Sequence, residues 1–260
     1  MIPAAQITNW RRDAPWANDD DVEQDLLISR AVVDLFNDPF LYDRLAFRGG
    51  TALHKLILVP ATRYSEDIDL VYLRNEPIGQ VFDHIRDALS WFELKPKSDI
   101  GMFPKLYFRF VTQSGISRRI KVEIATRETF SAERVIDVPY SVTSTYFTGR
   151  TQARTFAIEE LLATKLRAHL QRDKGRDLYD LWYAATNRDL DFAAIYQIFL
   201  GYWDATGLTR LTRGEVQQNL DRKKKAGIFE QVAPLLVPGK PYKPSDAAAW
   251  FEATVLPSFP

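Results

Sequence analysis

The sequence FRGGTALHKLILVPATRYSEDIDLVYLR, at residues 47–74, carries the strongest structural signal in the chain. Gly49 and Gly50 are its only adjacent glycines, and Thr51 follows them at the start of a predicted short helix. Glycine tolerates positive φ and lets a ligand approach the main chain, and free N–H groups at a helix N-terminus bind anions. The glycine pair therefore predicts either a tight turn between two helices or a cradle for phosphate groups.

Two aspartates follow the glycines on a segment with strand character. The β-branched and aromatic residues of DIDLVYL predict a strand, and residues two apart on a strand point to the same face. Asp67 and Asp69 would lie side by side, while Ile68 and Leu70 face the core. Two such carboxylates disfavour each other's ionisation unless a cation lies between them, and Mg²⁺ fits that place. The alternative is two solvated aspartates, which the centre of a strand rarely favours.

A third carboxylate lies on a predicted hairpin. Residues 105–111 (KLYFRFV) and 118–125 (RRIKVEIA) alternate in polarity around a glycine-containing connection, which is typical of antiparallel strands. Glu123 points away from the apolar face of its strand. If this strand neighbours the aspartates, three carboxylates converge, and Glu123 becomes the candidate general base. Otherwise it is an ordinary solvated residue.

The glycine turn and the carboxylates together meet the needs of a nucleoside triphosphate. The phosphates must be cradled and their metal ions held. Two metals that stabilise the entering and leaving oxygens support in-line attack on the α-phosphorus. We therefore predict an NTP-dependent nucleotidyltransferase that releases diphosphate. A metal-dependent nuclease could use the carboxylates but would leave the glycine turn unexplained.

Composition and charge narrow the class of protein. Lys+Arg and Asp+Glu both number 34, so the net charge is zero, whereas proteins that grip a long nucleic-acid backbone are normally more basic. The chain has no cysteine, which excludes a disulfide partner, Cys–Zn sites and thiol nucleophiles. No signal peptide or membrane-spanning apolar run is evident. We expect a cytoplasmic protein without a membrane partner.

The distribution of helix and strand patterns divides the chain into two predicted domains. Strand and helix signals alternate over residues 1–148, which begin with a helical arm, and long helical segments dominate residues 149–260. The boundary is placed in the polar, unpatterned stretch at residues 140–155. The expected fold class is α+β, with a mixed sheet flanked by helices and followed by a helical C-terminal domain.

Four segments carry a family resemblance: VEQDLLISRAV, FRGGTALHKL, RYSEDIDLV and TKLRAHLQRDKGRDLYDLW. In this order they resemble the AbiEii/AbiGii-type nucleotidyltransferase toxins of type IV toxin–antitoxin systems, which belong to the superfamily related to DNA polymerase beta. The resemblance implies a nucleotidyltransferase sheet domain, a helical domain, an NTP substrate, Mg²⁺ or Mn²⁺ as cofactor and a cognate antitoxin. Some family members add nucleotides to the acceptor end of tRNA, so tRNA is the expected acceptor.

The resemblance also implies roles for residues of the sheet domain. Asp67 and Asp69 would hold Mg²⁺, and Glu123 is the third metal ligand that strand alternation suggests. Ser65 would lie in the site, unless it only caps the turn into the strand. The residues expected to contact the triphosphate here are Gly49, Gly50, Thr51 and Ser65.

Basic residues of the segment 164–182 would complete the site. Lys165 matches the family's helical lysine and is expected to be catalytic and to bind nucleotide. At about 100° per residue, Arg172 and Arg176 would share its face if the helix continued through Gly175. These cations could neutralise triphosphate charge, although a solvated basic face is the commoner fate of such residues.

An acidic pair follows these cations in the family pattern. Asp177 and Asp180 match that pair; Asp177 is favoured as a catalytic partner, and Asp180 as a nucleotide-binding residue. Asp177 could instead cap a second helix. The Glu-Lys-Asp of the family's first helix appears here as Glu23-Gln24-Asp25, which puts any ionic role of the middle position in doubt.

Two other functions stay open at the sequence level. The same fold could transfer nucleotide to a protein or small-molecule acceptor, or the chain could be a non-catalytic nucleotide-binding module. The run Arg222–Lys225 and the strand residues Arg118, Arg119 and Lys121 could contact an RNA backbone, or form an ordinary solvated surface. No HExxH, GxSxG or Walker A pattern occurs, which argues against zinc and serine hydrolases and P-loop enzymes.

Overall fold

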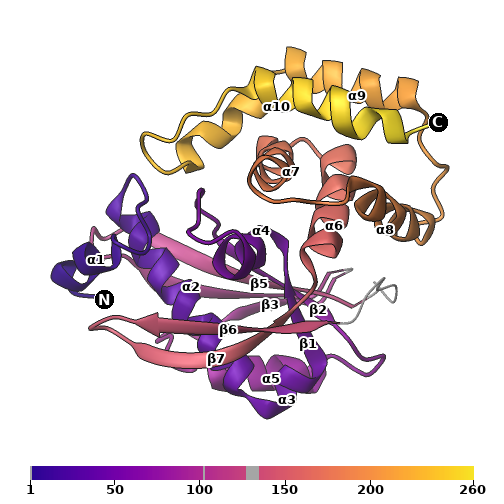
Figure 1. Ribbon diagram of the computed structural model, residues 1–260. Helices are drawn as coiled ribbons and strands as arrows, with labels where there is room; N and C mark the ends of the chain where they lie inside the picture. The colour runs from indigo at the N-terminus through magenta and orange to yellow at the C-terminus, as the bar shows by residue number, and fades with distance from the viewer. Residues whose placement is uncertain (1, 102, 127–134) are drawn as a thin grey trace. The chain divides into compact units, whose positions relative to one another are not determined.

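The computed structural model describes residues 2–101, 103–126 and 135–260. Within them the chain forms two compact units, of which unit 1 ends at Phe156 and unit 2 runs from Ala157 to Pro260. Unit 1 combines a mixed sheet with helices, and unit 2 is helical (Figure 1). The α+β fold class predicted from the sequence is confirmed.

A seven-stranded sheet in the order β3-β4-β5-β2-β1-β7-β6 forms the centre of unit 1 (Figure 1). The pairs β2–β5 and β1–β7 are parallel, and the other neighbours are antiparallel. The parallel pairing of β2 with β5 matters most, because it joins the two strands that carry the candidate carboxylates. The strands are β1 (Leu45–Arg48), β2 (Asp67–Tyr72), β3 (Lys97–Asp99), β4 (Lys105–Val111), β5 (Ser117–Ala125), β6 (Ile136–Thr143) and β7 (Thr148–Thr155).

The longest helix of unit 1 is α2, which packs against β6 and β7. Asn18 caps it by accepting a hydrogen bond from the Asp21 N–H. Most of the helix is buried, including Leu26, Ile28 and Val32. The helices of unit 1 are α1 (Ala4–Trp10), α2 (Asp19–Asn37), α3 (Pro39–Arg44), α4 (Gly49–Ala52), the π-helix η1 (Leu53–Ile57) and α5 (Gly79–Ala88).

Strands β6 and β7 occupy the stretch in which the sequence predicted a boundary. The structure places the division after Phe156, not after residue 148, because β7 pairs with both β6 and β1. Thr151, Ala153 and Thr155 alternate as the buried face of β7. The prediction of an unpatterned linker was wrong because small and β-branched polar residues, rather than large apolar ones, carry this alternation.

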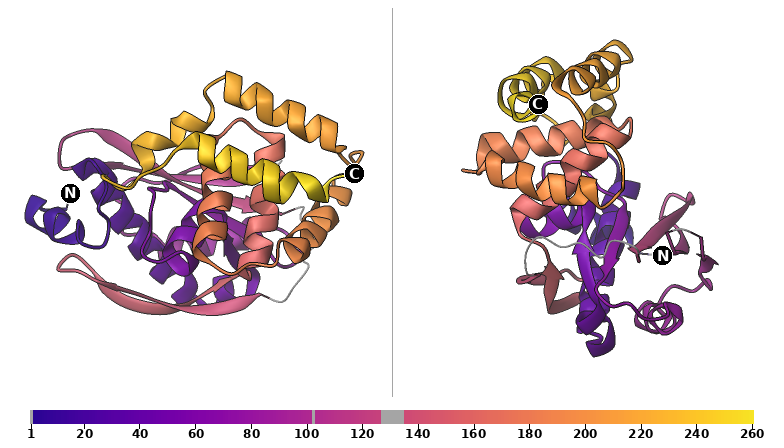
Figure 2. Two further views of the ribbon diagram at one scale, coloured as in Figure 1. Left: turned by 45° about the horizontal axis from the view of Figure 1, so that its top comes forward. Right: turned by 90° about the vertical axis from the view of Figure 1, so that its right-hand side faces the viewer.

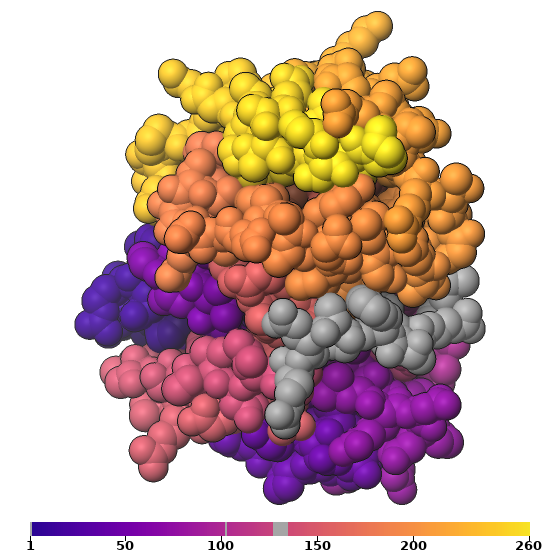
Figure 3. Space-filling model, turned by 45° about the vertical axis from the view of Figure 1, so that its right-hand side comes forward, coloured from indigo at the N-terminus to yellow at the C-terminus, as the bar shows by residue number. Residues whose placement is uncertain are grey.

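Unit 2 consists of helices, which Figure 2 shows from two further directions. Helix α6 packs against α7 and α8. In the space-filling view, the yellow residues at the C-terminal end lie at the top, next to the orange residues that precede them in the chain (Figure 3). No helix of the described residues is long and apolar enough to cross a membrane. The helices are α6 (Ile158–Gln171), α7 (Gly175–Asn187), α8 (Phe192–Asp204), α9 (Arg213–Lys225), η2 (Phe229–Leu235), α10 (Pro244–Trp250), η3 (Phe251–Val255) and η4 (Leu256–Ser258).

Candidate active site

Three carboxylates share one face of the sheet in unit 1. In the parallel pair of β2 and β5, Asp69 lies opposite Glu123 and Asp67 lies opposite Lys121. Ile68 on β2 is fully buried on the other face. The strand pairing therefore brings together the three acidic residues that alternation alone could only place on two separate strands.

An ammonium group lies between two of these carboxylates. Lys121 Nζ is 3.2 Å from Asp67 Oδ2 and 2.9 Å from Glu123 Oε2, and Lys105 Nζ is 3.8 Å from Glu123. The ion pairs with Asp67 and Glu123 raise the pKa of Lys121 although burial alone would lower it. Lys121, considered from the sequence as an RNA contact, thus belongs to the carboxylate cluster.

The donor chemistry of the cluster suits a hard divalent cation, but its spacing suits an ammonium ion. Carboxylate oxygens are the ligands that Mg²⁺ takes from proteins. Among the described residues, no three His, Asp or Glu side chains are spaced to hold a metal ion. Since Lys121 neutralises Asp67 and Glu123, a metal ion would have to displace its ammonium group.

The half-buried Asp69 side chain differs electrostatically from its neighbours. Burial raises its pKa, and the nearby charges of Asp67 and Glu123 raise it further. A carboxylate in such surroundings gains more from a cation than a solvated one. A cation beside Asp69 would therefore stabilise its charged form.

The glycine turn lies directly against this aspartate. Gly49 has a φ of +79°, and a Cβ placed on it would lie 2.3 Å from Asp69 Oδ2. A Cβ on Gly50 would lie 2.3 Å from the guanidinium of Arg63, which is fully buried. Both glycines are thus required by close approach, to the carboxylate on one side and to a buried arginine on the other.

The helix that starts at the turn is tied to β2 through hydroxyl groups. Thr51 Oγ1 lies 2.8 Å from Ser65 Oγ, and it also donates to the carbonyl of Asp67. Ser65 and Thr51 therefore hold the turn against the first aspartate. The sequence analysis did not identify Arg63 as a neighbour of the glycine turn. Its full burial, which is unusual for an arginine, is visible only in the structure.

A buried ion pair supports the turn from behind. Lys55 Nζ on η1 lies 2.9 Å from Asp25 Oδ2 on α2, and the two side chains are 10% and 5% exposed. Trp10 Nε1 donates to Asp25 Oδ1 at 3.0 Å, and Lys55 also donates to Ser29 at 2.9 Å. In the Glu23-Gln24-Asp25 segment, Asp25 therefore has a structural role: it holds Lys55 on the helix after the glycine turn.

The site residues predicted on the helical segment gather in unit 2. Lys165 Nζ on α6 is 3.2 Å from Asp177 Oδ1 and 3.0 Å from Asp180 Oδ2, and both aspartates are fully buried. Arg172 donates to both carboxylate oxygens of Asp177, at 2.7 and 2.9 Å. Burial alone would raise the pKa of Asp177, but the charges of Lys165 and Arg172 outweigh it and lower the pKa to about 2.

The condition under which both arginines would share the face of Lys165, a helix that continues through Gly175, is not met. Helix α6 ends at Gln171 and α7 starts at Gly175, so Arg172 does not share a helical face with Lys165. It reaches Asp177 from the connecting segment instead. Asp177 lies in the first turn of α7, where its carboxylate accepts hydrogen bonds from Lys165 and Arg172. It does not cap the helix, because the N-cap residue is Lys174. Among the described residues, Arg176 has no ion-pair partner.

The basic run at residues 222–225 is largely engaged within unit 2. Arg222 pairs with Asp173 at 2.6 Å, and Lys224 pairs with Glu252 at 2.7 Å. Lys223 is buried, with a side chain that is 1% exposed. Three of the four side chains in this run thus have partners within unit 2, which favours a structural role over the RNA contact considered from the sequence. On β5, Arg118 is likewise paired with Asp21 at 2.6 Å.

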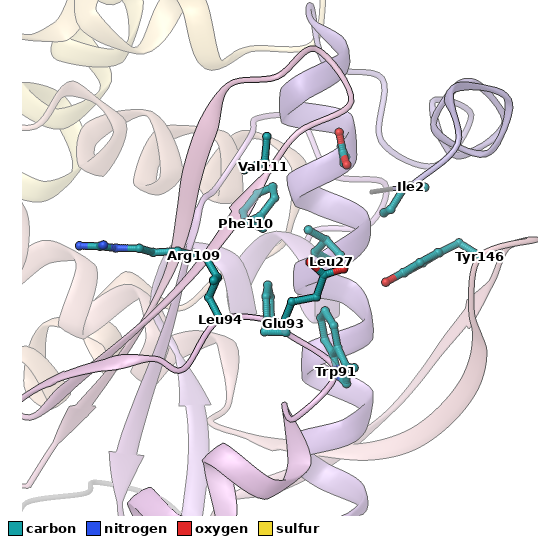
Figure 4. Close-up of a pocket in the computed structure, with 11 residues that line it drawn as sticks. Ile2, Leu27, Trp91, Glu93, Leu94, Arg109, Phe110, Val111 and Tyr146 are labelled. Atoms are coloured by element: carbon teal, nitrogen blue, oxygen red, sulfur yellow. The ribbon is translucent and has the colours of Figure 1, made fainter.

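A separate cavity of about 460 Å³ lies elsewhere in unit 1. Figure 4 shows Leu27, Trp91 and Phe110 around it, with the guanidinium of Arg109 extending away. None of the three clustered carboxylates lines this cavity. It is therefore not part of the carboxylate site.

Comparison with known proteins identifies the family. The family model described as "Nucleotidyl transferase AbiEii toxin, Type IV TA system" matches residues 30–253. The chain belongs to the AbiEii nucleotidyltransferase toxin family. This AbiEii-family protein is accordingly a nucleotidyltransferase and a toxin of a toxin–antitoxin system, a class that implies a cognate antitoxin.

One solved structure extends the likeness of this AbiEii-family toxin at the level of the fold. MenT4, a nucleotidyltransferase toxin from Mycobacterium tuberculosis H37Rv, aligns with a TM-score of 0.59 and 22% identity, over 76% of this chain and 69% of that one. An antigenic nucleotidyltransferase-like protein from Paracoccidioides brasiliensis aligns with a TM-score of 0.39 and 14% identity, over 80% and 93% of the two chains. No curated protein matches the sequence.

Proposed function

We propose that this AbiEii-family toxin transfers a nucleoside monophosphate from an NTP to RNA, with the acceptor end of tRNA as the target. Family membership supports the reaction class. The observation that carries the assignment of residues is the gathering of Asp67, Asp69 and Glu123 on one sheet face, with Gly49 directly against Asp69. A blocked tRNA end would stop translation and growth.

In this proposal the glycine turn would bind the phosphate groups of the triphosphate, and the carboxylates would bind its metal ions. The main chain at Gly49 and Gly50, with Thr51 and Ser65 behind it, would accept phosphate groups. With the Lys121 ammonium group displaced, Asp67, Asp69 and Glu123 would hold Mg²⁺ or Mn²⁺, which would supply neutralisation of the charge that develops on the phosphate oxygens.

The acceptor hydroxyl would attack the α-phosphorus, and the bond from that phosphorus to the diphosphate oxygen would break. Glu123 would take the hydroxyl proton. Lys165, together with Arg172 and Arg176, would neutralise the triphosphate. Because Asp177 is held as a carboxylate by two cations, it would orient Lys165, with Asp180 as the second anchor.

The acceptor, the antitoxin and the compartment are proposed by analogy with the family rather than from the geometry. RNA is proposed because related toxins modify tRNA ends. The reaction would occur in the cytoplasm, which holds both tRNA and NTPs. A cognate antitoxin would restrain the growth arrest.

Transfer of label from each of the four α-³²P NTPs tests the proposal directly. The purified toxin is incubated with Mg²⁺ and deproteinised bacterial tRNA, and we expect labelled tRNA with at least one nucleotide and none with Asp69→Ala. A parallel reaction contains RNase-treated cell extract. Label on protein or a small molecule only in that reaction would reject the RNA acceptor but keep the enzyme class. Absence of label in every reaction would reject the proposal.

A further inference from the structure

The connection between α6 and α7 determines where Arg172 points. This segment, residues 172–174, lies between Gln171 and Gly175, the helix ends on either side. Arg172 is its first residue, and its guanidinium binds both oxygens of Asp177. A connecting segment without its own helical hydrogen bonds needs other contacts to hold one conformation. The structure shows those contacts, and they come from α9.

Lys223 on α9 binds the C-terminal end of α6. Its ammonium group donates to the carbonyls of His169 and Arg172, the second at 3.0 Å. The last carbonyls of a helix have no partner within the helix, and a positive charge is favourable at that end. The side chain of Lys223 is 1% exposed, so these carbonyls take the place of water around it.

Two neighbouring residues of α9 hold the same segment. Arg222 binds both carboxylate oxygens of Asp173, at 2.8 and 2.6 Å. Asn219 donates to the carbonyl of Leu170 at 3.3 Å. Together, three side chains spaced along one face of α9 contact the end of α6 and the start of the connection.

Resting on the function proposed above for Lys165 and Asp177, we propose that α9 is the positioning element of this basic–acidic group and that Lys223 is its central positioning residue. Lys223 fixes the main chain at Arg172, Arg172 fixes Asp177, and Asp177 holds Lys165. The C-terminal part of the chain thus serves the nucleotide site without contributing a reacting group. Arg222 and Lys223, the first two residues of the basic run at 222–225, have their role in these contacts.

A double-mutant cycle tests this chain of contacts. Lys223→Met keeps the length and apolar body of the side chain but removes the donors, and we expect kcat/KM for nucleotide transfer to fall by about ten- to a hundredfold. The matched control is Lys240→Met, at an exposed lysine of unit 2, with kcat/KM unchanged. In an Arg172→Gln background, Lys223→Met should cause no further loss, because its effect passes through Arg172. A purely structural role would instead multiply the two losses, and that result would overturn the proposal.

Hydrogen exchange gives a readout that does not depend on turnover. Peptides covering residues 170–177 should exchange faster in Lys223→Met than in the wild type or in Lys240→Met, while those from α8 should not change. Unchanged exchange in a folded Lys223→Met protein would reject the positioning role even if transfer fell. If the wild type transfers no nucleotide, the proposed function fails, and exchange at residues 170–177 still decides whether α9 holds the connection.

Arg222→Gln covers the case in which Lys223→Met does not fold. It breaks only the exposed pair with Asp173, so the core of unit 2 stays intact. We expect faster exchange over the same peptides and a smaller loss of kcat/KM, again absent in the Arg172→Gln background. Multiplication of the two losses, or exchange equal to that of the wild type, would count against the proposal.

Discussion

Asp69 on β2 lies directly opposite Glu123 on β5, in a parallel pair of strands. The pairing puts two carboxylates from segments far apart in the sequence on one face, with Asp67 two residues along β2. Like charges so placed are stable only with cations nearby. Lys121 supplies one such cation. Burial and the charges of Asp67 and Glu123 raise the pKa of Asp69, so a second cation would favour its charged form.

Loss of the Asp69 charge should abolish transfer without unfolding the protein. We expect Asp69→Asn to lower kcat/KM by about a thousandfold, since several kcal/mol of charge stabilisation would be lost. Because burial raises the pKa of Asp69, a neutral amide should not destabilise the fold. Asp99→Asn, at an exposed position of β3, is the control. A variant within tenfold of wild type would show that Asp69 is not in the reaction centre.

A methyl group at Gly49 should separate backbone strain from contact with Asp69. Gly49→Ala meets a positive φ and a Cβ 2.3 Å from Asp69 Oδ2, whereas Gly115→Ala meets a similar φ of +85° in open space. Gly115→Ala should lower the free energy of unfolding by about 1–2 kcal/mol, and Gly49→Ala should lower it by more, because its Cβ also forces the Asp69 side chain to shift. Only Gly49→Ala should lower transfer, by about a hundredfold. Urea titrations and label transfer measure the two effects, and equal activities would show that the contact with Asp69 is unimportant.

Removal of the Lys121 charge should strengthen divalent-metal binding. Lys121→Met leaves Asp67 and Glu123 without the ammonium group between them, so we expect Mn²⁺ to bind about tenfold more tightly. Electron paramagnetic resonance of free Mn²⁺ measures the affinity. Lys97→Met, at an exposed position of β3, should bind like the wild type. Weaker binding by Lys121→Met would mean that this lysine organises the ligands rather than competing with the metal.

Acid should destabilise unit 2 through His169. Burial, followed by the charge of Lys223, lowers the pKa of His169 to about 3. The unfolded chain takes up the proton near pH 6.5, so stability is complete above that pH and is lost as the pH falls toward 3. Between about pH 7.5 and about pH 5.5 we expect a loss of about 1.4 kcal/mol that is absent in His169→Phe. Urea unfolding at both values tests this, and parallel pH profiles of the two proteins would contradict it.

Local pattern was enough to predict three of the seven strands in the described residues, β2, β4 and β5, and which of their side chains share a face. Alternation in DIDL and KVEI put Asp67, Asp69 and Glu123 on the faces where the structure has them. Their convergence required β2 and β5 to be neighbours, which depends on the topology of the whole sheet. The same alternation also placed Lys121 on that face. The sequence left its role open between an RNA contact and a solvated surface, because pairing between strands cannot be read from either strand alone.

Where the sequence misled, long-range contacts outweighed local signals. Helix α6 stops at Gln171 because Lys223, fifty-odd positions further along the chain, binds its last carbonyls and α7 starts afresh at Gly175. Strand β7 forms from small polar residues because β6 and β1 supply its partners. Neither partner is visible in the window of sequence that forms the element.

The Lys55–Asp25 pair links the stability of the glycine turn to the N-terminal arm, because α1 contributes Trp10 to the hydrogen bonds of Asp25. Trp10 donates a hydrogen bond to Asp25, the aspartate that pairs with Lys55 on η1. A shortened protein that lacks Trp10 would therefore leave the Asp25 carboxylate more exposed, close to the helix that follows the glycine turn. Variants that trim the first residues should then transfer less nucleotide, and loss of function in them would say nothing about the carboxylates.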